Sequence, residues 1–501
     1  MLSALIWIPI LGAILIGFWP GSLSTKFVRQ SAIAVSLLGF LVSVFLGIQF
    51  EPQVSGLQFS EFLPWIPTLG INYSLGVDGL SLPLVLLNTL LSGIAIYSTD
   101  ESIQRPRFYY SLILIIIGGV NGVFLAQNLL LFFLFYEVEL IPLYLLIGIW
   151  GGAKKGYAAT KFLIYTALSG IILLACFLGV VFLSHSTSFD LISLDTKSIP
   201  LETQIVLLVG ILIAFGIKIP LVPFHTWLPD AHVEASTPIS VLLAGVLLKL
   251  GTYGLLRYGL CLFPDAWEFV APWLASWAVV STLYGASCAI AQKDMKKMVA
   301  YSSIAHMGYI LLGSAAATPL SLLGTVLQMV SHGLISGLMF LCVGVVYRKS
   351  GSRDIDILKG LLNPERGLPV IGSLMIVGVM ASSGIPGMAG FIAEFLVFRG
   401  SLGVFPVPTL LCMIGTGLTS VYFLIMINRV FFGRLSDLVI NLPSVRWRDR
   451  IPSMILAVII VVLGVAPSTL VSLTEKTTRE MVMTVAPSKL VSQSLGNLPG
   501  N

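Results

Sequence analysis

Apolar runs of about 20 residues recur along almost the whole chain, separated by short polar connections. A helix of about 20 apolar residues is long enough to cross a hydrocarbon core of about 30 Å. The pattern therefore predicts an all-α polytopic membrane protein. It predicts fourteen spanning helices, with approximate cores at 2–19, 31–50, 78–98, 108–127, 128–150, 159–183, 203–227, 237–261, 270–290, 298–316, 319–347, 369–398, 405–430 and 452–472.

The composition agrees with this class. The 501 residues are 56% hydrophobic and 10% charged, and the mean hydropathy is +0.97. A soluble chain of this length would carry about 25% charged residues.

The basic residues test the number of spans, because Lys and Arg collect in the connections on one side of a membrane. Of the 28 Lys and Arg residues, 19 fall in connections after odd-numbered spans. Only Lys197 and Arg399 follow even-numbered spans, and Lys476, Arg479 and Lys489 lie in the tail. We expect the odd connections to face the cytoplasm and both termini to face the lumenal or periplasmic side. The net charge of +5 reflects this asymmetry and does not indicate nucleic-acid binding.

No cofactor or metal motif is visible in the sequence. The five cysteines are scattered through apolar segments without a CxxC pair, a spacing that excludes an iron–sulfur cluster or a zinc ribbon. There is no GxxxxGK[ST] loop, and the glycine-rich GTGLTS at 415–420 lies inside an apolar span, where it indicates helix packing. We therefore expect no redox cofactor, nucleotide or metal in this chain.

A few ionisable residues lie inside the predicted spans. Lys161 and Arg257 are near span ends, where long side chains reach water. Lys249 is central in its span, where a lysine costs roughly 2.5–3.5 kcal/mol, so its surroundings must be polar or hydrated. Lys218 lies just before a proline. Acids and imidazoles show the same pattern, with Glu137, Glu139, Glu394, His306 and His332 inside spans. Together these groups predict a lateral polar chain through the membrane centre.

Two of the predicted spans contain helix-breaking prolines. The Ile-Pro pairs at 219–220 and 385–386 open the helix, because proline lacks a backbone donor and clashes with the preceding turn. Five spans separate the two breaks, so the broken helices have opposite orientations. This spacing predicts an inverted repeat of spans 4–8 and 9–13. The predicted divisions are 1–107, 108–262 (first repeat), 263–435 (second repeat) and 436–501.

The break beside Lys218 gives the lysine a hydrated partner and a pKa that its neighbours can tune. A carboxylate such as Glu137 would hold the lysine charged, and its withdrawal would favour proton loss. Glu139 points about 200° away from Glu137 on a continuous helix, so the two cannot face the same neighbour. Glu139 is the alternative partner of Lys218.

Six motifs resemble the antiporter-like subunits of respiratory complex I. They are FYEVELIP, GIKIPLVPFHTWLPDAH, AGVLLKLGTYGLLR, AYSSIAHMGY, QMVSHGL and GMAGFIAEF, which run in the family order over roughly residues 70 to 435. The chain is most similar to the chain 4 type of NAD(P)H–quinone oxidoreductase in its cyanobacterial and plastid branch. In that type the position of Glu394 holds Glu, whereas the sister subunits hold Lys.

The resemblance implies a role for each matching residue. Glu137 and Lys218 would gate proton transfer, Lys249 would be the central relay, His306 and His332 would continue the path, and Glu394 would end it. His225, Asp230 and His232 belong to the HTWLPDAH signature, for which a structural and proton-uptake role is favoured over metal binding.

The implied function is proton pumping in a thylakoid or plasma membrane, driven by quinone reduction in other subunits that hold the iron–sulfur clusters. The implied partners are further membrane-arm subunits, including antiporter-like ones, and lipids. There are two alternatives. One is a cation/proton antiporter of the related Mrp type, and the other is a membrane scaffold whose charges only fix helix packing. The amino-terminal 70 residues and the tail favour the variant that serves carbon dioxide uptake.

Overall fold

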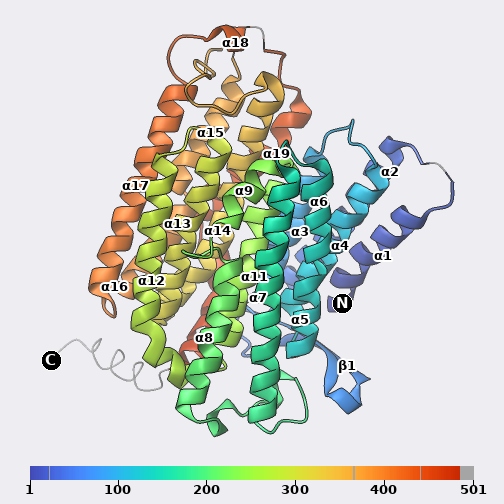
Figure 1. Cartoon of the computed structure of the whole chain (residues 1–501), viewed down its shortest axis with the longest axis vertical. Coiled ribbons are helices and arrows are strands. Elements are labelled where there is room, and N and C mark those ends of the chain that lie inside the picture. The colour runs from blue at the N-terminus through green and yellow to red at the C-terminus, as the bar shows by residue number, and fades with distance from the viewer. Residues whose placement is uncertain (22, 365–366, 441, 486–501) are drawn as a thin grey trace.

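Long helices run along one common direction in the computed structural model, with most connecting segments at its two ends (Figure 1). The structure describes residues 1–485 apart from 22, 365–366 and 441. The helices of the first half are α1 (Leu2–Phe18), α2 (Thr25–Gln49), α3 (Ser81–Ser98), α4 (Pro106–Leu125), α5 (Leu129–Val138), α6 (Leu140–Trp150), α7 (Lys155–Leu183), α8 (Leu201–Lys218), α9 (Trp227–Glu234), α10 (Thr237–Leu242) and α11 (Leu248–Gly254). Those of the second half are α12 (Pro264–Ile290), α13 (Met295–Ala316), α14 (Pro319–Ser350), α15 (Pro369–Ser382), α16 (Ala389–Leu402), α17 (Pro406–Val430), α18 (Asp437–Ile440), α19 (Trp447–Val465) and α20 (Ser468–Val485).

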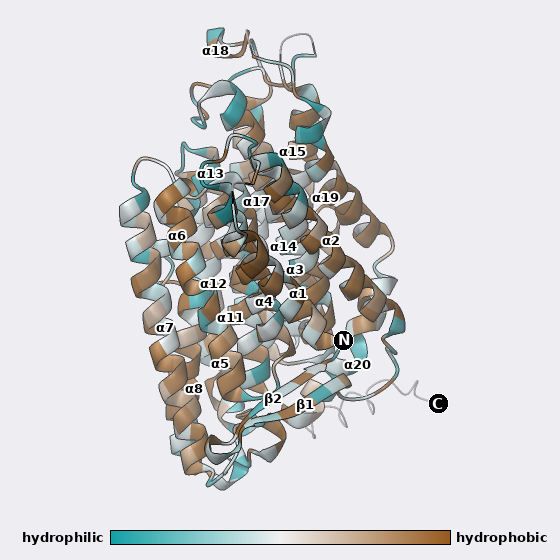
Figure 2. Ribbon diagram, turned by 90° about the vertical axis from the view of Figure 1, so that its right-hand side faces the viewer, coloured by the Kyte–Doolittle hydropathy of each residue, from teal (hydrophilic) through white to brown (hydrophobic). Residues whose placement is uncertain are grey.

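In the described part of the chain, ten helices or continuous helix pairs are long and apolar enough to cross a membrane. The pair α5–α6 counts as one of them, and so does the continuous stretch Thr237–Leu260. Helices α19 and α20 meet at a bend of 68°. Figure 2 shows apolar residues over most of the helical surface. The protein is a helical multi-pass membrane protein, as the sequence predicts.

Two helices stop and resume at the positions where the Ile-Pro pairs predict breaks. Helix α8 ends at Lys218 and α9 begins at Trp227, while α15 ends at Ser382 and α16 begins at Ala389. Proline cannot donate the backbone hydrogen bond that would continue either helix. The segments 219–226 and 383–388 therefore leave polar backbone groups inside the bundle, which a membrane protein tolerates only where protein or water satisfies them.

A third interruption was not predicted. The span expected at 128–150 divides at Glu139, between α5 and α6. Pro142 has no N–H to donate to the carbonyl four residues earlier, at Val138, so the helical turn opens there.

The central span 237–260 is also irregular, because two π-helical turns, η4 (Leu243–Leu247) and η5 (Leu255–Leu260), flank α11. A π-turn widens the helix by one residue and leaves a carbonyl displaced from its usual partner. Lys249 lies directly after the first of these turns.

The segment between α2 and α3 forms an antiparallel hairpin, which the all-α prediction missed. Strand β1 (Gln58–Ile66) pairs with β2 (Ile71–Val77), and Gly70 turns the chain with φ of +66°. The two short 3-10 helices η2 (Leu191–Ser193) and η3 (Thr196–Ser198) follow α7. Met1 pairs with Glu61 of the hairpin, so the N-terminus lies at this end of the molecule.

Helix α14 and the stretch Thr237–Leu260 form the interior of the bundle. Their apolar windows are wholly buried, whereas only 28% of the window of α2 is buried. A Cβ added at Gly333 would lie 2.8 Å from the carbonyl oxygen of Gly245. Glycine at this contact lets the two helices approach closely, which places His332 of α14 beside Lys249.

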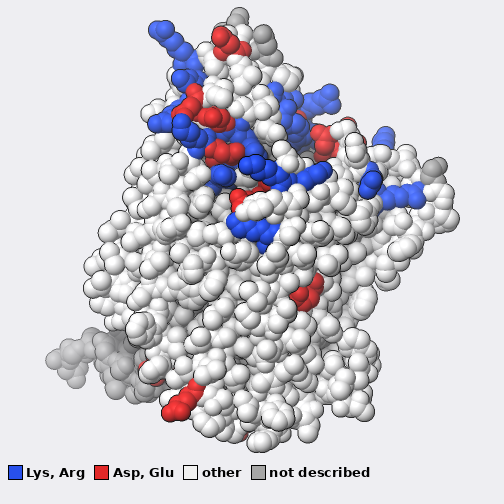
Figure 3. Space-filling view, in the orientation of Figure 1, with Lys and Arg blue, Asp and Glu red and all other residues white. Residues whose placement is uncertain are grey.

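Lys and Arg gather at one end of the molecule, around α18 and the ends of the neighbouring helices (Figure 3). We call this the basic end. The hairpin and the start of α8 lie at the opposite end (Figure 1). Arg366 and Lys489, which entered the count of basic residues, lie outside the described residues.

Two basic side chains that were expected to reach water form ion pairs. Lys161 Nζ lies 2.8 Å from Asp230 Oδ2, and Arg257 binds Asp78 with 2.6 Å between Nη2 and Oδ2. The side chains of Arg257 and Asp78 are 13% and 5% exposed. Asp78 also caps α3 by accepting hydrogen bonds from Leu80 and Ser81, so the pair ties the start of α3 to the end of η5.

Arg257→Met should lower the free energy of unfolding by about 3–5 kcal/mol, because Asp78 would remain as an uncompensated buried charge. Thermal unfolding in detergent measures this loss. Arg348→Met is the matched control, since Arg348 pairs with Asp449 in a more exposed position, and it should cost about 1 kcal/mol or less. Equal losses in the two variants would contradict the prediction.

Candidate functional site

A buried ion pair lies at the break between α8 and α9. Lys218, the last residue of α8, is 1% exposed and pairs with the fully buried Glu139. The ammonium also lies 4.4 Å from the centre of the Tyr136 ring. Transfer of one proton from Lys218 to Glu139 would neutralise both groups, so the pair can exist in a charged and a neutral form. This property is what a proton-transfer gate requires.

In this structure Lys218 contacts Glu139, whereas the sequence analysis favoured Glu137 as its partner. The role of Glu137 as the gate partner stays a prediction. The half-buried carboxylate of Glu137 lies against α7, where a Cβ added at Gly170 would be 2.1 Å from its Oε1. Glu137 and Glu139 face different neighbours because two residues apart on a helix point roughly 200° apart. Glu139, at the junction of α5 and α6, has the position beside Lys218.

The central lysine is held by two partners. Lys249 is fully buried, and its Nζ donates to the carbonyl of Ala244 at 2.6 Å, which lies in the π-turn. The same Nζ lies 2.8 Å from Nδ1 of His332. Because an ammonium only donates, this Nδ1 accepts, and the ring proton of His332 is on Nε2. Lys249 and His332 are therefore arranged for proton exchange across α11 and α14.

The path continues to a second imidazole. The ring centres of His332 and His306 are 5.6 Å apart. Nδ1 of His306 lies 2.7 Å from the carbonyl of Ser302, and its Nε2 lies 3.2 Å from the carbonyl of Ser382. Carbonyl oxygens only accept, so both contacts are satisfied together only by a doubly protonated ring.

Glu394 follows His306. Its Oε1 lies 3.6 Å from Nε2 of His306, and the side chain is almost fully buried. Its Oε2 lies 3.0 Å from Oγ1 of Thr416, which is 3.2 Å from the hydroxyl of Tyr309. Ser382 is the last residue of α15, so the second helix break supplies backbone to the His306–Glu394 site.

The structure thus brings five of the six predicted relay residues together in two groups, with Glu139 in place of Glu137. One is Glu139–Lys218, and the other is Lys249–His332–His306–Glu394. The three signature residues lie elsewhere. His225 stacks edge-on against Tyr284, Asp230 pairs with Lys161, and His232 stacks on Phe340.

Sequence reasoning missed several contacts of the site. Thr416 lies in the GTGLTS stretch, which was interpreted only as helix packing. Gly415 does pack closely, because an added Cβ would lie 2.2 Å from Thr282, but Thr416 contacts Glu394. Tyr136, which lies against Lys218, directly precedes Glu137 in the FYEVELIP motif. Its place in that motif was the available sequence signal. The carbonyl of Ala244 has no sequence signal, since it depends on the π-turn.

The chemistry of these groups is proton exchange. Carboxylate, ammonium and imidazole groups can each take up and release protons, and buried ionisable residues of this kind mark proton relays in membrane proteins. Among the residues that the structure describes, no three His, Cys, Asp or Glu side chains are arranged to hold a metal ion.

Comparison with known proteins finds relatives that belong to one family. Residues 126–420 match the family described as NADH:quinone oxidoreductase/Mrp antiporter, TM. The chain is 40% identical to an NAD(P)H-quinone oxidoreductase chain 4 of Nostoc sp., over 98% of this chain and 95% of the relative. It is 44% identical to a chain 4 of Synechococcus sp., over 86% of this chain and 82% of the relative.

Solved structures share the fold. A chain of respiratory complex I from Thermus thermophilus superposes with a TM-score of 0.88 at 26% identity, over 97% of this chain and 100% of that chain. A chain of the Mrp complex from Dietzia sp. gives 0.84 at 19% identity, over 98% of each chain. The chain belongs to the NADH:quinone oxidoreductase/Mrp antiporter family of membrane subunits, among its NAD(P)H-quinone oxidoreductase chain 4 members.

Proposed function

We propose that this chain is the proton-translocating membrane subunit of an NAD(P)H–quinone oxidoreductase complex. The observation that carries the proposal is the row of buried ionisable groups, Lys249–His332–His306–Glu394, with the Glu139–Lys218 pair beside the first helix break. The names of the chain 4 relatives supply the class of complex.

The Glu139–Lys218 pair acts as the gate in this proposal. While the pair is charged, each group stabilises the charge of the other, and the proton stays on Lys218. Separation of the two side chains removes that stabilisation and lets the lysine release its proton. The backbone of 219–226 is not helical, so this movement does not require unfolding a regular helix.

The second group carries the proton across the bundle. Lys249 gives a proton to Nδ1 of His332, and His332 releases one from Nε2 on its other side. His306 passes the proton to Glu394, which lies at the second helix break beside Thr416. The proposal takes Glu394 as the terminal group of this row.

The finer topology is part of the proposal. We infer fourteen membrane crossings, with 108–262 and 263–435 as inverted repeats, 1–107 as three preceding helices and 436–501 as the closing helix and tail. The last range extends beyond the described residues. The basic end would face the cytoplasm, and both termini would face the lumenal or periplasmic side of a cyanobacterial thylakoid or plasma membrane.

Electron transfer is assigned to other subunits. We propose that quinone and iron–sulfur clusters are held outside this chain, and that its neighbours include further antiporter-like subunits and lipids. Membership in a complex that serves carbon dioxide uptake stays a prediction, tested by identifying the proteins that copurify in mild detergent.

A cation/proton antiporter of Mrp type is the second candidate, because the Mrp complex from Dietzia sp. shares the fold. Glu394 favours the redox-driven subunit, since the chain 4 type holds Glu here. Dependence of proton movement on sodium rather than on electron transfer would favour the antiporter.

Glu139→Gln should slow coupled quinone reduction more than about tenfold in the purified complex, because Lys218 would lose its contacting counter-charge. Lys218→Ala should be equally severe, and the double variant little worse than either single variant, since one shared step is lost. Turnover is measured in sealed vesicles with and without a protonophore, which separates gating from assembly.

Glu137→Gln is the matched control for this gate, because it is the same substitution two residues away on a half-buried side chain. It should have a smaller effect than Glu139→Gln. If the effects of Glu139→Gln and Lys218→Ala simply add in the double variant, the gate is refuted. If Glu137→Gln slows turnover more than Glu139→Gln does, the gate is assigned to Glu137.

Lys249→Ala should leave the complex assembled but suppress the number of protons pumped per electron, because His332 would have no proton donor in the span 237–260. Thr252→Ala, one turn along in the same buried helix, should pump normally. Unchanged pumping in the Lys249 variant would reject the relay. A lower yield of assembled complex, with a normal number of protons per electron in the complex that does assemble, would favour the scaffold alternative.

A further inference from the structure

An apolar groove of about 300 Å³ lies between α2 and α19, and α3 packs against both helices. Most of the side chains that line it are apolar. Ser36 and Thr89 are exceptions, but the hydroxyl of each donates to a carbonyl of its own helix. A buried water needs two to four polar partners, so this lining suits an apolar ligand better than water.

The α2 wall of the groove is one helical stripe with an arginine at its end. Ile33 and Phe40 line the groove, and Arg29 precedes Ile33 by four residues, so it lies on the same face and nearer to the basic end. The guanidinium of Arg29 lies 5.6 Å from the ring centre of Tyr97, which also lines the groove. From Ile33 to Phe40 the wall is about 10 Å long, at about 1.5 Å per residue.

The α19 wall has the same arrangement. Pro452 and Ile455 line the groove, and Arg448 precedes them by four and seven residues on the same face. Arg448 also lines a small hollow that shares Tyr97 and Pro452 with the groove. Both helices start at the basic end, so the two arginines lie at the basic-end opening, which we call the groove mouth.

The two arginines share one acid. Nη1 of Arg29 lies 3.6 Å from Oε1 of Glu101, and Arg448 pairs with the same carboxylate. Each guanidinium also donates to a carbonyl after or at the end of α3, Arg29 to Tyr97 at 2.8 Å and Arg448 to Thr99 at 3.0 Å. The arginines are therefore held in place, while the side chain of Glu101 is 64% exposed.

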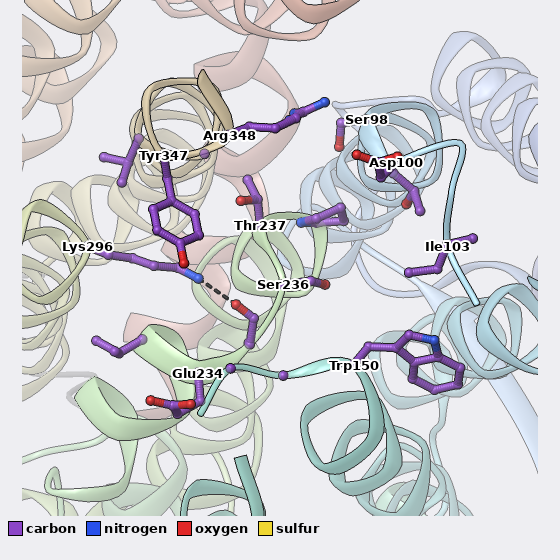
Figure 4. A pocket seen from close by; sticks show the side chains of 18 of the residues that line it. Ser98, Asp100, Ile103, Trp150, Glu234, Ser236, Thr237, Lys296, Tyr347 and Arg348 are labelled. Atoms are coloured by element: carbon purple, nitrogen blue, oxygen red, sulfur yellow. Dashed lines mark hydrogen bonds between the residues drawn. The ribbon is translucent and has the colours of Figure 1, made fainter. Parts of the chain in front are cut away.

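The surrounding charges leave the mouth positive. Asp449 pairs with Arg348 at 3.0 Å, and Asp100 lines a neighbouring cavity together with Arg348 (Figure 4). Basic side chains still outnumber acidic ones around the mouth, because five bases lie there with three acids: Lys26, Arg29, Arg348, Arg448 and Arg450 with Asp100, Glu101 and Asp449. Lys26 is exposed, lies three residues before Arg29, and forms no ion pair among the described residues.

We propose that this groove is a binding site for an anionic membrane lipid, with one acyl chain between α2 and α19 and the headgroup at Lys26, Arg29 and Arg448. The order of the site, apolar inside and cationic at the basic end, matches the order of chain and headgroup in such a lipid. Basic pockets between transmembrane helices bind anionic headgroups in this way. The proposal does not depend on proton transfer, because none of these residues belongs to the relay.

A helix of a neighbouring subunit is the competing occupant. A helix about 10 Å in diameter would fill about 800 Å³ over a length of about 10 Å, which is more than twice the volume of the groove. A helix would therefore enter only in part, whereas an acyl chain fits inside. The positive mouth also favours an anionic headgroup over the uncharged surface of a membrane-spanning helix.

The first test uses two photoreactive lipids on the purified complex in phosphatidylcholine bilayers. A phosphatidylglycerol with a diazirine on its acyl chain should label the segments 33–40 or 451–455, as peptide mass spectrometry would show. Phosphatidylcholine with the same diazirine should label them about fivefold less or weaker still, because its headgroup has no net charge. Equal labelling by the two probes, or none, would overturn the proposal.

Substitutions at the mouth test the headgroup contacts. The double variant Arg29→Gln with Arg448→Gln should lower labelling by the phosphatidylglycerol probe to the level of the phosphatidylcholine probe. Arg434→Gln is the matched control, because it removes one positive charge from an exposed side chain between α17 and α18 at the same end of the molecule. It should label like the unaltered protein. An equal loss with Arg434→Gln would show general surface attraction and overturn the site.

Filling the groove tests the place of the acyl chain. Gly93 lines the groove, and an added Cβ would lie 3.6 Å from Oγ of Ser36, an ordinary contact that the helices tolerate. Gly93→Leu should therefore occupy the groove and remove labelling of 33–40 and 451–455 while the charges of the mouth stay. Unchanged labelling in this variant would show that the chain lies elsewhere.

The competing occupant is tested in the assembled complex. Leu37 lines the groove and is 52% exposed, so Leu37→p-benzoylphenylalanine places a photoreactive group at its opening. Illumination should give an adduct with the phosphatidylglycerol of the bilayer. A cross-link to another subunit in place of that adduct would overturn the lipid site in favour of a helix. Proton pumping is not measured in any of these tests, so their failure would leave the proposed function untouched.

Discussion

A charge inside a membrane-embedded bundle must have a partner, and this constraint governs the interior of the protein. An isolated ion in a medium of low dielectric constant costs roughly several kcal/mol, even after the surrounding protein relaxes. Several buried ionisable groups of the described interior meet such a partner. Glu139 meets Lys218, Asp78 meets Arg257, and Lys249 meets a carbonyl and an imidazole. These pairs stabilise the bundle, and some of them also provide exchangeable protons.

The partners are supplied by irregular backbone. The π-turn before Lys249 offers the carbonyl of Ala244, and the end of α15 offers that of Ser382 to His306. The break at Glu139 gives Lys218 a carboxylate. Regular and irregular segments thus have separate tasks: the long helices bury apolar surface, and their interruptions satisfy the charges.

The proposed proton transfer depends on the same separation of regular and irregular segments. A group fixed by several strong contacts in a rigid helix would hold one protonation state. The gate pair lies instead where two helices end, α8 at Lys218 and α5 at Val138, so a small displacement of either end changes the distance between the charges. Such bistable junctions convert small movements into discrete changes of state. The close contact of Gly245 with Gly333, by contrast, holds Lys249 and His332 together.

The sequence by itself determined the membrane class, the segregation of basic residues to one end and the two proline breaks. It also named most residues of the proposed relay, including Lys249, His306, His332 and Glu394. These features depend on local composition, on hydrophobic run length and on the high cost of buried charge, all of which are readable along one chain. The tertiary structure alone decided which carboxylate contacts Lys218, because Glu137 and Glu139 point in different directions and only the packing of the helices determines which of them faces the lysine. It also decided that Arg257 binds Asp78 across the fold and that Thr416 contacts Glu394. Those pairings join residues far apart in sequence, and only the packing of the helices brings them within hydrogen-bonding distance.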